Sequence, residues 1–272
     1  MGDLDGRTFL VTGANAGIGQ ATAVELATRG GRVFVANRSE ERSHEVLEQL
    51  GDSGVYLHLD LADLSSVRAC AKEFLERGEL LHVLVNNAGV GGQRGFTADG
   101  FELNFGVNHL GHFLLTNLLL DRLKESSPAR IVNVSSDGHY QAKGIDWDAV
   151  RKPTRTFTAL PEYAVSKLCN VLFTQELARR VEGTGLTTYA VHPGAIASQI
   201  WRRVPWPIRP VMTAFMKSNE QGARTSVWCA TAPELAGQTG RYYDGSEEKE
   251  PSAVGTPELG RELWERSAAW TS

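Results

Sequence analysis

The 272-residue chain has little of several features that mark other classes of protein. Its cysteines number only three, and Cys70, Cys169 and Cys229 lie far apart, so we expect neither a disulfide framework nor a metal site. So few cysteines, in odd number, favour a reducing compartment, and we expect a cytoplasmic protein. A formal net charge of −4 without a basic run argues against a nucleic-acid partner.

Long apolar runs are missing as well, so we expect no signal peptide and no integral membrane segment. The hydrophobic content of 42% and the charged content of 22% are those of an ordinary globular protein. No internal repeat is found and nothing marks a second domain. We therefore expect one domain over residues 1–272.

The stretch that organises the chain is residues 9–20, where an apolar strand leads into Gly13, Gly17 and Gly19. An amphipathic run follows, Ala21–Arg29, which predicts a helix. Strand, glycine turn and helix form the first half of a dinucleotide-binding unit, because bare backbone can approach a pyrophosphate and a helix N-terminus presents N–H groups to it. The spacing is G-x-x-x-G-x-G rather than G-x-G-x-x-G, and taken alone it fits a plain tight turn equally well.

The rest of the chain alternates apolar strands with amphipathic helices. This predicts an α/β fold: a single Rossmann-type doubly wound domain with a mostly parallel sheet flanked by helices on both faces. Strands are expected at residues 32–38, 55–61, 81–85, 130–136, 187–192 and 240–244, and helices at 39–50, 64–76, 107–123, 162–181, 220–230 and 258–266.

The end of the second strand bears on the choice of cofactor. NAD-binding folds carry an acid there, about 20 residues past the glycines, which bonds the ribose 2′-hydroxyl. This chain has Arg38 and no acid beside it. A guanidinium would pair with a 2′-phosphate, so NADP(H) is favoured over NAD(H). The alternative is a surface arginine that opens the following helix.

Three later motifs follow in order. Asn86-Asn87-Ala88-Gly89 ends the fourth strand, Ser136 ends the fifth, and a helix then carries Tyr163 and Lys167. The last two are four positions apart (167 − 163 = 4) and so share a helical face. With the glycine turn, these motifs make the chain from about Gly6 to Asp244 resemble the short-chain dehydrogenase/reductase family. The sequence Asn108-His-Leu-Gly-His-Phe-Leu-Leu-Thr resembles its retinol-dehydrogenase-like branch. That branch usually has an N-terminal membrane anchor, which we do not expect in this chain.

The resemblance implies a catalytic role for each of four residues. Tyr163 would be the general acid in carbonyl reduction and the general base in alcohol oxidation. Lys167 would lower the pKa of Tyr163 and bond the nicotinamide ribose. Ser136 would hold the substrate oxygen, and Asn108 would keep a water in line with Lys167. A buried asparagine that is merely satisfied stays open as an alternative for Asn108.

The resemblance also implies a set of cofactor contacts at the carboxyl ends of the strands. They are Gly13, Asn15, Ala16, Gly17, Ile18, Gly19, Arg38, Asp60, Leu61, Asn87, Ala88, Gly89, Tyr163, Lys167, Pro193, Gly194, Ile196 and Ser198. Asp60 and Leu61 would line the adenine pocket, although a solvated strand-end Asp60 stays open. Pro193 and Gly194 would seat the nicotinamide.

We therefore expect an NADP(H)-dependent oxidoreductase that interconverts a lipophilic aldehyde or ketone and its alcohol. Two alternatives remain: an epimerase or dehydratase on the same scaffold, and a non-catalytic NADP(H)-binding regulator. The intact set of Ser136, Tyr163 and Lys167 argues against the regulator, because a sensor does not need it.

Two segments are expected to shape the substrate site. Residues 195–220 hold Trp201, Trp206, Met212 and Met216 among prolines, which predicts an apolar substrate lid. The alternatives are packing on the core or contact with a membrane surface. Residues 137–161 form an insertion that we expect to cover the helices at 108–123 and 163–181, with Trp147, Val150, Phe157 and Leu160 facing inward. This favours a monomer; a homodimer is expected if the insertion instead lines the substrate entrance.

Overall fold

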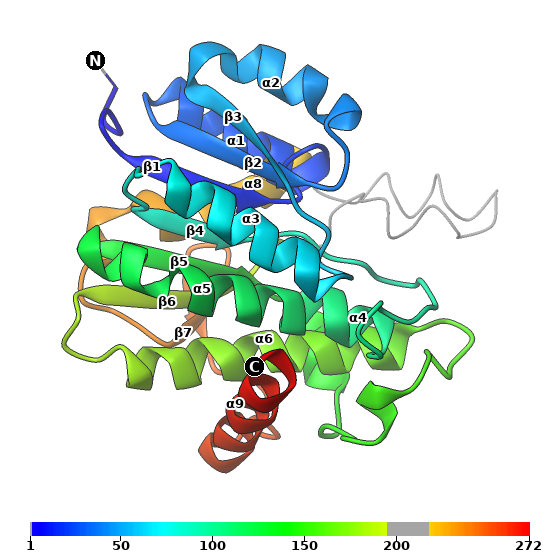
Figure 1. Ribbon diagram of the computed structural model, residues 1–272. Helices are drawn as coiled ribbons and strands as arrows, with labels where there is room; N and C mark the ends of the chain where they lie inside the picture. Colours follow the sequence, from blue (N-terminus) through cyan, green and yellow to red (C-terminus); the bar gives the residue numbers. More distant parts are fainter. Residues whose placement is uncertain (1, 195–217) are drawn as a thin grey trace.

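The computed structural model describes residues 2–194 and 218–272, and these form one eight-stranded sheet with helices on both faces (Figure 1). The strands are β1 (Thr8–Thr12), β2 (Arg32–Asn37), β3 (Gly54–His58), β4 (Val83–Asn86), β5 (Ala129–Val134), β6 (Leu186–His192), β7 (Arg241–Asp244) and β8 (Glu247–Lys249). The helices are α1 (Gly17–Thr28), α2 (His44–Leu50), α3 (Leu64–Glu76), α4 (Leu103–Phe105), α5 (Gly111–Glu125), α6 (Leu160–Arg180), α8 (Asn219–Thr231) and α9 (Pro257–Thr271).

The strand order confirms the expected doubly wound sheet. It runs β3-β2-β1-β4-β5-β6-β7-β8, and every neighbouring pair is parallel except β7 with β8. The chain adds strands outward from β1 in one direction and then returns to add β4 on its other side. Ligands of such sheets bind at the carboxyl ends of the strands where this reversal occurs.

Strand β8 was not expected from the sequence. Its residues Glu247–Lys249 are charged and exposed, and they pair antiparallel with β7 at the edge of the sheet. Neither an apolar run nor an alternation marks such a strand. A charged edge of this kind hinders pairing with another chain.

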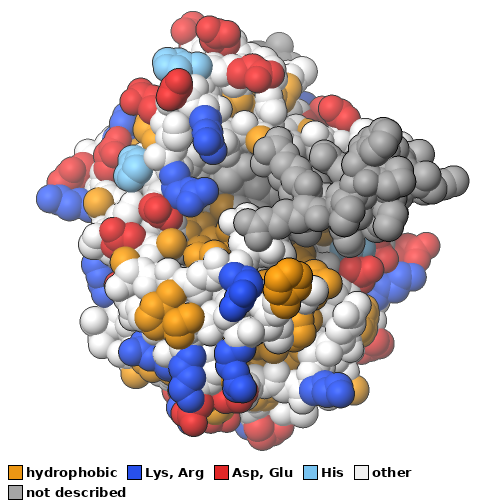
Figure 2. All heavy atoms as spheres, turned by 90° about the vertical axis from the view of Figure 1, so that its right-hand side faces the viewer, with side chains coloured by type: hydrophobic (Ala, Val, Ile, Leu, Met, Phe, Trp, Pro, Cys, Tyr) orange, Lys and Arg blue, Asp and Glu red, His pale blue; other side chains and the backbone are white. Residues whose placement is uncertain are grey.

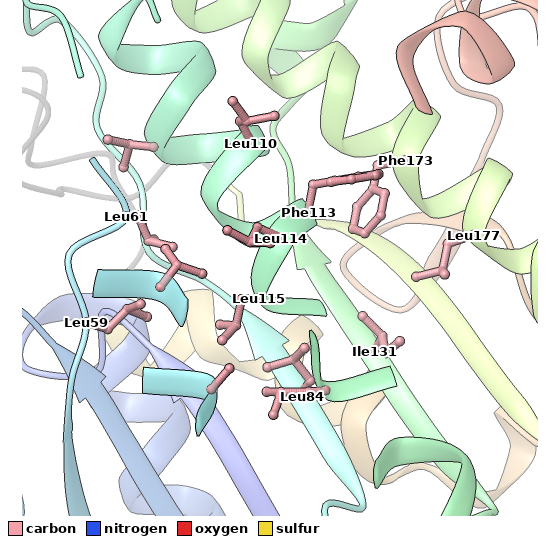
Figure 3. Packing of buried hydrophobic residues seen from close by; sticks show 14 of the residues in the cluster. Leu59, Leu61, Leu84, Leu110, Phe113, Leu114, Leu115, Ile131, Phe173 and Leu177 are labelled. Atoms are coloured by element: carbon pink, nitrogen blue, oxygen red, sulfur yellow. The ribbon is translucent and has the colours of Figure 1, made fainter. Parts of the chain in front are cut away.

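Successive residues of a strand point to opposite faces of the sheet and pack in two different hydrophobic cores. Leu84 and Ile131 point to the face covered by α3, α5 and α6, where they meet Phe113, Leu115 and Leu177 (Figure 3). Their neighbours in the strands, such as Val83, Val85 and Val132, pack on the opposite face with residues of α1, α2 and α8. Burial on both faces explains why these strands are continuous apolar runs rather than alternating ones.

The C-terminal helix α9 covers α5 and α6 from outside (Figure 1). The Trp264 ring lies 4.9 Å from that of Phe113 on α5 and 5.9 Å from that of Phe173 on α6, centroid to centroid. Such aromatic pairs add stabilisation beyond the area they bury. The helix expected at 258–266 is longer in the structure, where α9 spans Pro257–Thr271, and it packs into the main core through Leu263.

The expectation that residues 137–161 cover these helices with four inward side chains is wrong. Val150 is buried and Trp147 is partly buried against the core, but Phe157 is 89% exposed and Leu160 is 47% exposed. The insertion is too polar to bury along its length, and α9 supplies most of the aromatic cover instead.

Within the described ranges, no helix combines the length and the hydropathy needed to span a membrane. The three cysteines are all buried and unpaired.

Candidate active site

A cleft of ≈ 750 Å³ opens at the carboxyl ends of β1, β2, β3 and β4. Figure 2 looks onto this edge and shows a hollow with hydrophobic side chains inside and Lys or Arg side chains beside it. Of the predicted cofactor contacts, the cleft is lined by Gly13, Asn15, Ala16, Gly17, Ile18, Gly19, Arg38, Asp60, Leu61, Asn87, Ala88 and Gly89. Tyr163, Lys167, Pro193 and Gly194 are not in its lining, while Ile196, Ser198 and the lid segment up to residue 217 lie outside the described residues.

The glycine turn fits tightly against the end of β4. Gly13 has a φ of +68°, and a Cβ there would lie 2.8 Å from Cα of Ala88. A Cβ on Gly19 would lie 2.4 Å from Nδ2 of Asn87. Only glycine fits at these two positions, so the backbone itself forms the floor of the cleft.

The end of β4 is tied to the end of β1 by hydrogen bonds. Asn87 N and Ala88 N donate to the Thr12 hydroxyl at 3.0 and 2.9 Å, and Asn87 Nδ2 donates to the Thr12 carbonyl at 2.8 Å. Asn86 Nδ2 donates to Asn133 Oδ1 of β5 at 2.8 Å. The two asparagine side chains thus tie β4 to its neighbours on both sides.

Two arginines form a cationic corner of the cleft. Arg38 follows β2 directly, and Arg42 lies four positions further on (42 − 38 = 4). Both are exposed, and among the described residues neither guanidinium forms an ion pair with a carboxylate. Sequence reasoning missed Arg42, because only the position at the strand end has a known meaning in dinucleotide binding.

Asp60 and Leu61, which follow β3, also line the cleft. Asp60 Oδ1 accepts from Ala62 N at 2.9 Å, so part of this carboxylate shapes its own turn. Leu61 is buried, and α5 passes so close that a Cβ on Gly111 would lie 2.8 Å from the Leu61 carbonyl oxygen. Glycine at that position therefore fixes how near α5 comes to the cleft.

Lys167 lies in the interior beside Tyr163. Its Nζ donates to the Val134 carbonyl at 2.9 Å and lies 5.5 Å from the centre of the Tyr163 ring. Burial lowers the pKa of Lys167 to about 8. The cleft side is near, since a Cβ on Gly89 would lie 3.6 Å from this Nζ.

Ser136 and Tyr163 are adjacent across Gly138. A Cβ on Gly138 would lie 3.4 Å from both the Ser136 Oγ and a carbon of the Tyr163 ring. Burial raises the pKa of Tyr163, a hydrogen bond with Ser136 opposes the rise, and the charge of Asp137 adds to it. The expected lowering by Lys167 is therefore corrected: the pKa of Tyr163 is raised, because burial disfavours the phenolate.

Asn108 lies in a π-helical turn, Gly106–Leu110, between α4 and α5. Its Oδ1 accepts from Val90 N at 2.8 Å, and its Nδ2 donates to the Val90 carbonyl and to Ser166 Oγ, both at 2.9 Å. The amide thus ties the loop after β4 to α6. Both N–H donors of the amide are therefore used within the protein. Single π turns are frequent at functional sites.

Two further polar residues next to Ser136 were missed. Asp137 Oδ1 accepts from the Ser136 hydroxyl at 3.0 Å. His192 Nδ1 accepts from Asp137 N at 3.2 Å, and its Nε2 lies 3.9 Å from Asp137 Oδ2. His192 ends β6 and precedes Pro193 and Gly194 directly, and Asp137 follows Ser136. In the sequence, only the position of Asp137 and His192 next to motif residues could have indicated that they belong to the site.

Comparisons with known proteins agree with this geometry. A sequence profile of the family described as "short chain dehydrogenase" matches residues 7–147. Human retinol dehydrogenase 13 is 43% identical over 280 residues, covering 97% of this chain and 84% of that protein. Mouse retinol dehydrogenase 12 is 47% identical over 251 residues, covering 88% and 78%. The crystal structure of an uncharacterised protein from Mycobacterium paratuberculosis has a TM-score of 0.81 and 33% identity, covering 99% of this chain and 96% of the other.

The tight fit at Gly13 predicts a strong effect of a single methyl group. The Gly13→Ala variant should have a lower free energy of unfolding. Left-handed backbone strain should lower it by about 1–2 kcal/mol, and the clash with Ala88 should lower it by about 1–3 kcal/mol more. Gly6→Ala is the matched control, because Gly6 has a φ of +76° but nothing lies within 4 Å of its Cβ position. Urea unfolding gives the stabilities, and fluorescence titration gives NADPH affinity. Equal losses in the two variants, or undiminished NADPH binding by Gly13→Ala, would contradict the fit described.

Proposed function

The chain belongs to the short-chain dehydrogenase/reductase family, and from this premise we propose that it is an NADP(H)-dependent oxidoreductase. It interconverts a lipophilic aldehyde or ketone and its alcohol. The observation that carries the proposal is the grouping of three side chains: the Ser136 hydroxyl is hydrogen-bonded to the Tyr163 phenol, and the buried Lys167 Nζ lies 5.5 Å from the centre of the Tyr163 ring. A merely structural role does not require a tyrosine held between a serine and a buried lysine.

The residues present fit a nicotinamide dinucleotide. The side-chain-free backbone at Gly13 and Gly19 can approach a pyrophosphate, and α1 begins at Gly17 with its N–H groups directed to the same place. Arg38 and Arg42 supply two cations for a 2′-phosphate. When bound, the nicotinamide supplies the hydride.

Tyr163 is the proton donor for the carbonyl oxygen. Because burial raises its pKa, it holds its proton at neutral pH, which is the form that carbonyl reduction requires. Ser136 is placed to donate a hydrogen bond to the same oxygen as negative charge develops there. To do so its hydroxyl turns from Asp137 Oδ1, now 3.0 Å away, to the substrate. Lys167 places a donor beside Tyr163.

The lipophilic substrate is supported by two observations. The relatives named above are retinol dehydrogenases, and retinol is a lipophilic alcohol. In this chain Phe157 and Leu160 are exposed just before the turn that carries Tyr163, so apolar side chains stand next to the catalytic helix. The predicted lid at 195–220 belongs to this proposal as well.

A screen of NADPH oxidation over aldehydes and ketones graded by size and lipophilicity tests the function. Hydrophobic carbonyl compounds should be turned over, with one NADPH consumed per alcohol formed. Tyr163→Phe should abolish this turnover but leave NADPH affinity nearly intact, because only the proton donor is lost. The proposal fails if small polar ketoacids are preferred, or if Tyr163→Phe stays active. Conversion without net NADPH use indicates an epimerase or dehydratase instead.

Cofactor preference depends on Arg38 and Arg42. Arg38→Asp should weaken NADPH binding by about 1.5–3 kcal/mol, or roughly 10–150-fold, and leave NADH binding much less affected. Arg42→Asp should act in the same direction. Lys124→Asp, an equal charge change at the exposed end of α5, is the control for long-range electrostatics. An unmutated enzyme that uses NADH as well as NADPH contradicts the preference.

Asp137 should affect the pH dependence of alcohol oxidation. Oxidation needs the Tyr163 phenolate, so its rate rises as the pH passes the pKa of Tyr163. Asp137 raises this pKa, so Asp137→Asn should lower it and move the oxidation profile to lower pH. Asp148→Asn, at an exposed carboxylate of the insertion, is the control. A profile that stays in place or moves upward contradicts the role given to Asp137.

The cover provided by α9 leads us to propose a monomer. A two-fold partner that used the outer faces of α5 and α6 would have to displace the Trp264 ring from Phe113 and Phe173. Light scattering at micromolar concentration should therefore give the mass of one chain. A stable dimer or tetramer at that concentration contradicts this proposal.

A further inference from the structure

His112 is a buried polar residue to which none of the motifs gives a role. It lies on the inner face of α5 and is 2% exposed. Its Nε2 is 2.9 Å from the Thr12 hydroxyl, and its Nδ1 is 3.1 Å from the Asn108 carbonyl oxygen. One ring thus contacts both the end of β1 and the π turn.

The partners determine which ring nitrogen carries the proton. A carbonyl oxygen only accepts, so Nδ1 must donate to Asn108. The Thr12 oxygen already accepts from Asn87 N and Ala88 N. Its own hydrogen is directed to Nε2 at 2.9 Å rather than to the Val85 carbonyl, which lies 3.5 Å away. Burial lowers the pKa of His112 to about 4, so this neutral form persists at any ordinary pH.

Each of the two hydrogen bonds reaches a different half of the site. Thr12 precedes Gly13 directly and holds the end of β4, so the Nε2 bond fixes the cofactor turn. Asn108 is tied through its amide to Val90 and to Ser166, the residue before Lys167. The Nδ1 bond therefore fixes the turn that faces the catalytic lysine.

We propose that His112 is a positioning residue. Its Nε2 holds the cofactor turn through Thr12, and its Nδ1 holds the Asn108 carbonyl, so the two parts of the site keep a fixed position relative to each other. The inference rests on the proposed function. It assigns His112 no proton transfer, and it predicts that the two bonds affect two different measurable properties.

Two substitutions separate the bonds. In His112→Gln the Oε1 takes the place of Nε2 and can still accept from Thr12, but the donor to Asn108 is lost. In His112→Asn the Nδ2 takes the place of Nδ1 and can donate to the Asn108 carbonyl, while Thr12 is out of reach. Asn117 on the same helix already makes this contact with the carbonyl four residues back, Phe113, at 2.8 Å.

The control is His109→Gln. His109 is also buried, three positions earlier in the π turn (112 − 109 = 3), but its Nε2 meets Ser267 Oγ of α9 at 3.0 Å, among aromatic rings. This variant should lower the thermal stability and leave NADPH affinity and kcat unchanged. It gives the effect of losing a buried histidine without disturbing the site.

The measurements are the Kd of NADPH by fluorescence without substrate, kcat and KM with a carbonyl substrate, and the melting temperature. His112→Asn should raise the Kd about tenfold and keep most of kcat. His112→Gln should keep the Kd within about twofold and lower kcat about tenfold, with the limbs of the kcat–pH profile unmoved. Three results overturn the proposal. Both variants keep the wild-type Kd and kcat, or both lose only thermal stability, as His109→Gln does. The third is that both variants lose NADPH affinity and kcat to the same extent.

A shifted or missing acid limb in His112→Gln also overturns it, because His112 would then transfer protons itself. The Kd comparison needs no turnover, so it separates the two ideas. If the wild-type chain reduces no carbonyl, the proposed function fails while the Thr12 bond is still tested.

Discussion

The hydrogen bonds from Asn87 N and Ala88 N to the Thr12 hydroxyl are the contact on which the rest of the site depends. They join the ends of β1 and β4, the neighbouring strands between which the sheet reverses its order. The glycine turn, which follows Thr12, and the loop that faces Lys167, which follows Ala88, both start from this contact. Gly13 and Gly19 are required because the two strand ends approach too closely for a Cβ.

Burial determines the protonation states of Tyr163 and Lys167, the pair for which we propose a catalytic role. Lys167 is buried and Tyr163 is half-buried, and this burial lowers the pKa of the lysine to about 8 and raises that of the tyrosine. Both shifts favour the neutral forms, so Tyr163 is poised as an acid rather than as a base. The carboxylate of Asp137 acts in the same direction on Tyr163. The arrangement thus supports carbonyl reduction near neutral pH, with oxidation favoured at higher pH.

The parts of the fold and site predicted from the sequence are those with a periodic or spaced signal. Apolar runs located seven of the eight strands, and the spacing of Tyr163 and Lys167 placed both on one helix face. The missed features lack such a signal. Strand β8 is charged, Arg42 and Asp137 are ordinary surface residue types, and the contact of His112 with Thr12 joins residues 100 positions apart. The insertion was misjudged because the competing cover, α9, comes from the other end of the chain.

The central claim is that this chain moves a hydride between the nicotinamide and a carbonyl carbon. It is tested most directly with NADPH that carries deuterium on the transferring face of nicotinamide C4, and with mass spectrometry of the alcohol. The account predicts one deuterium on the carbinol carbon in ordinary water, and none on that carbon when unlabelled NADPH is used in heavy water. A substrate that is converted while the deuterium stays in the cofactor would contradict it.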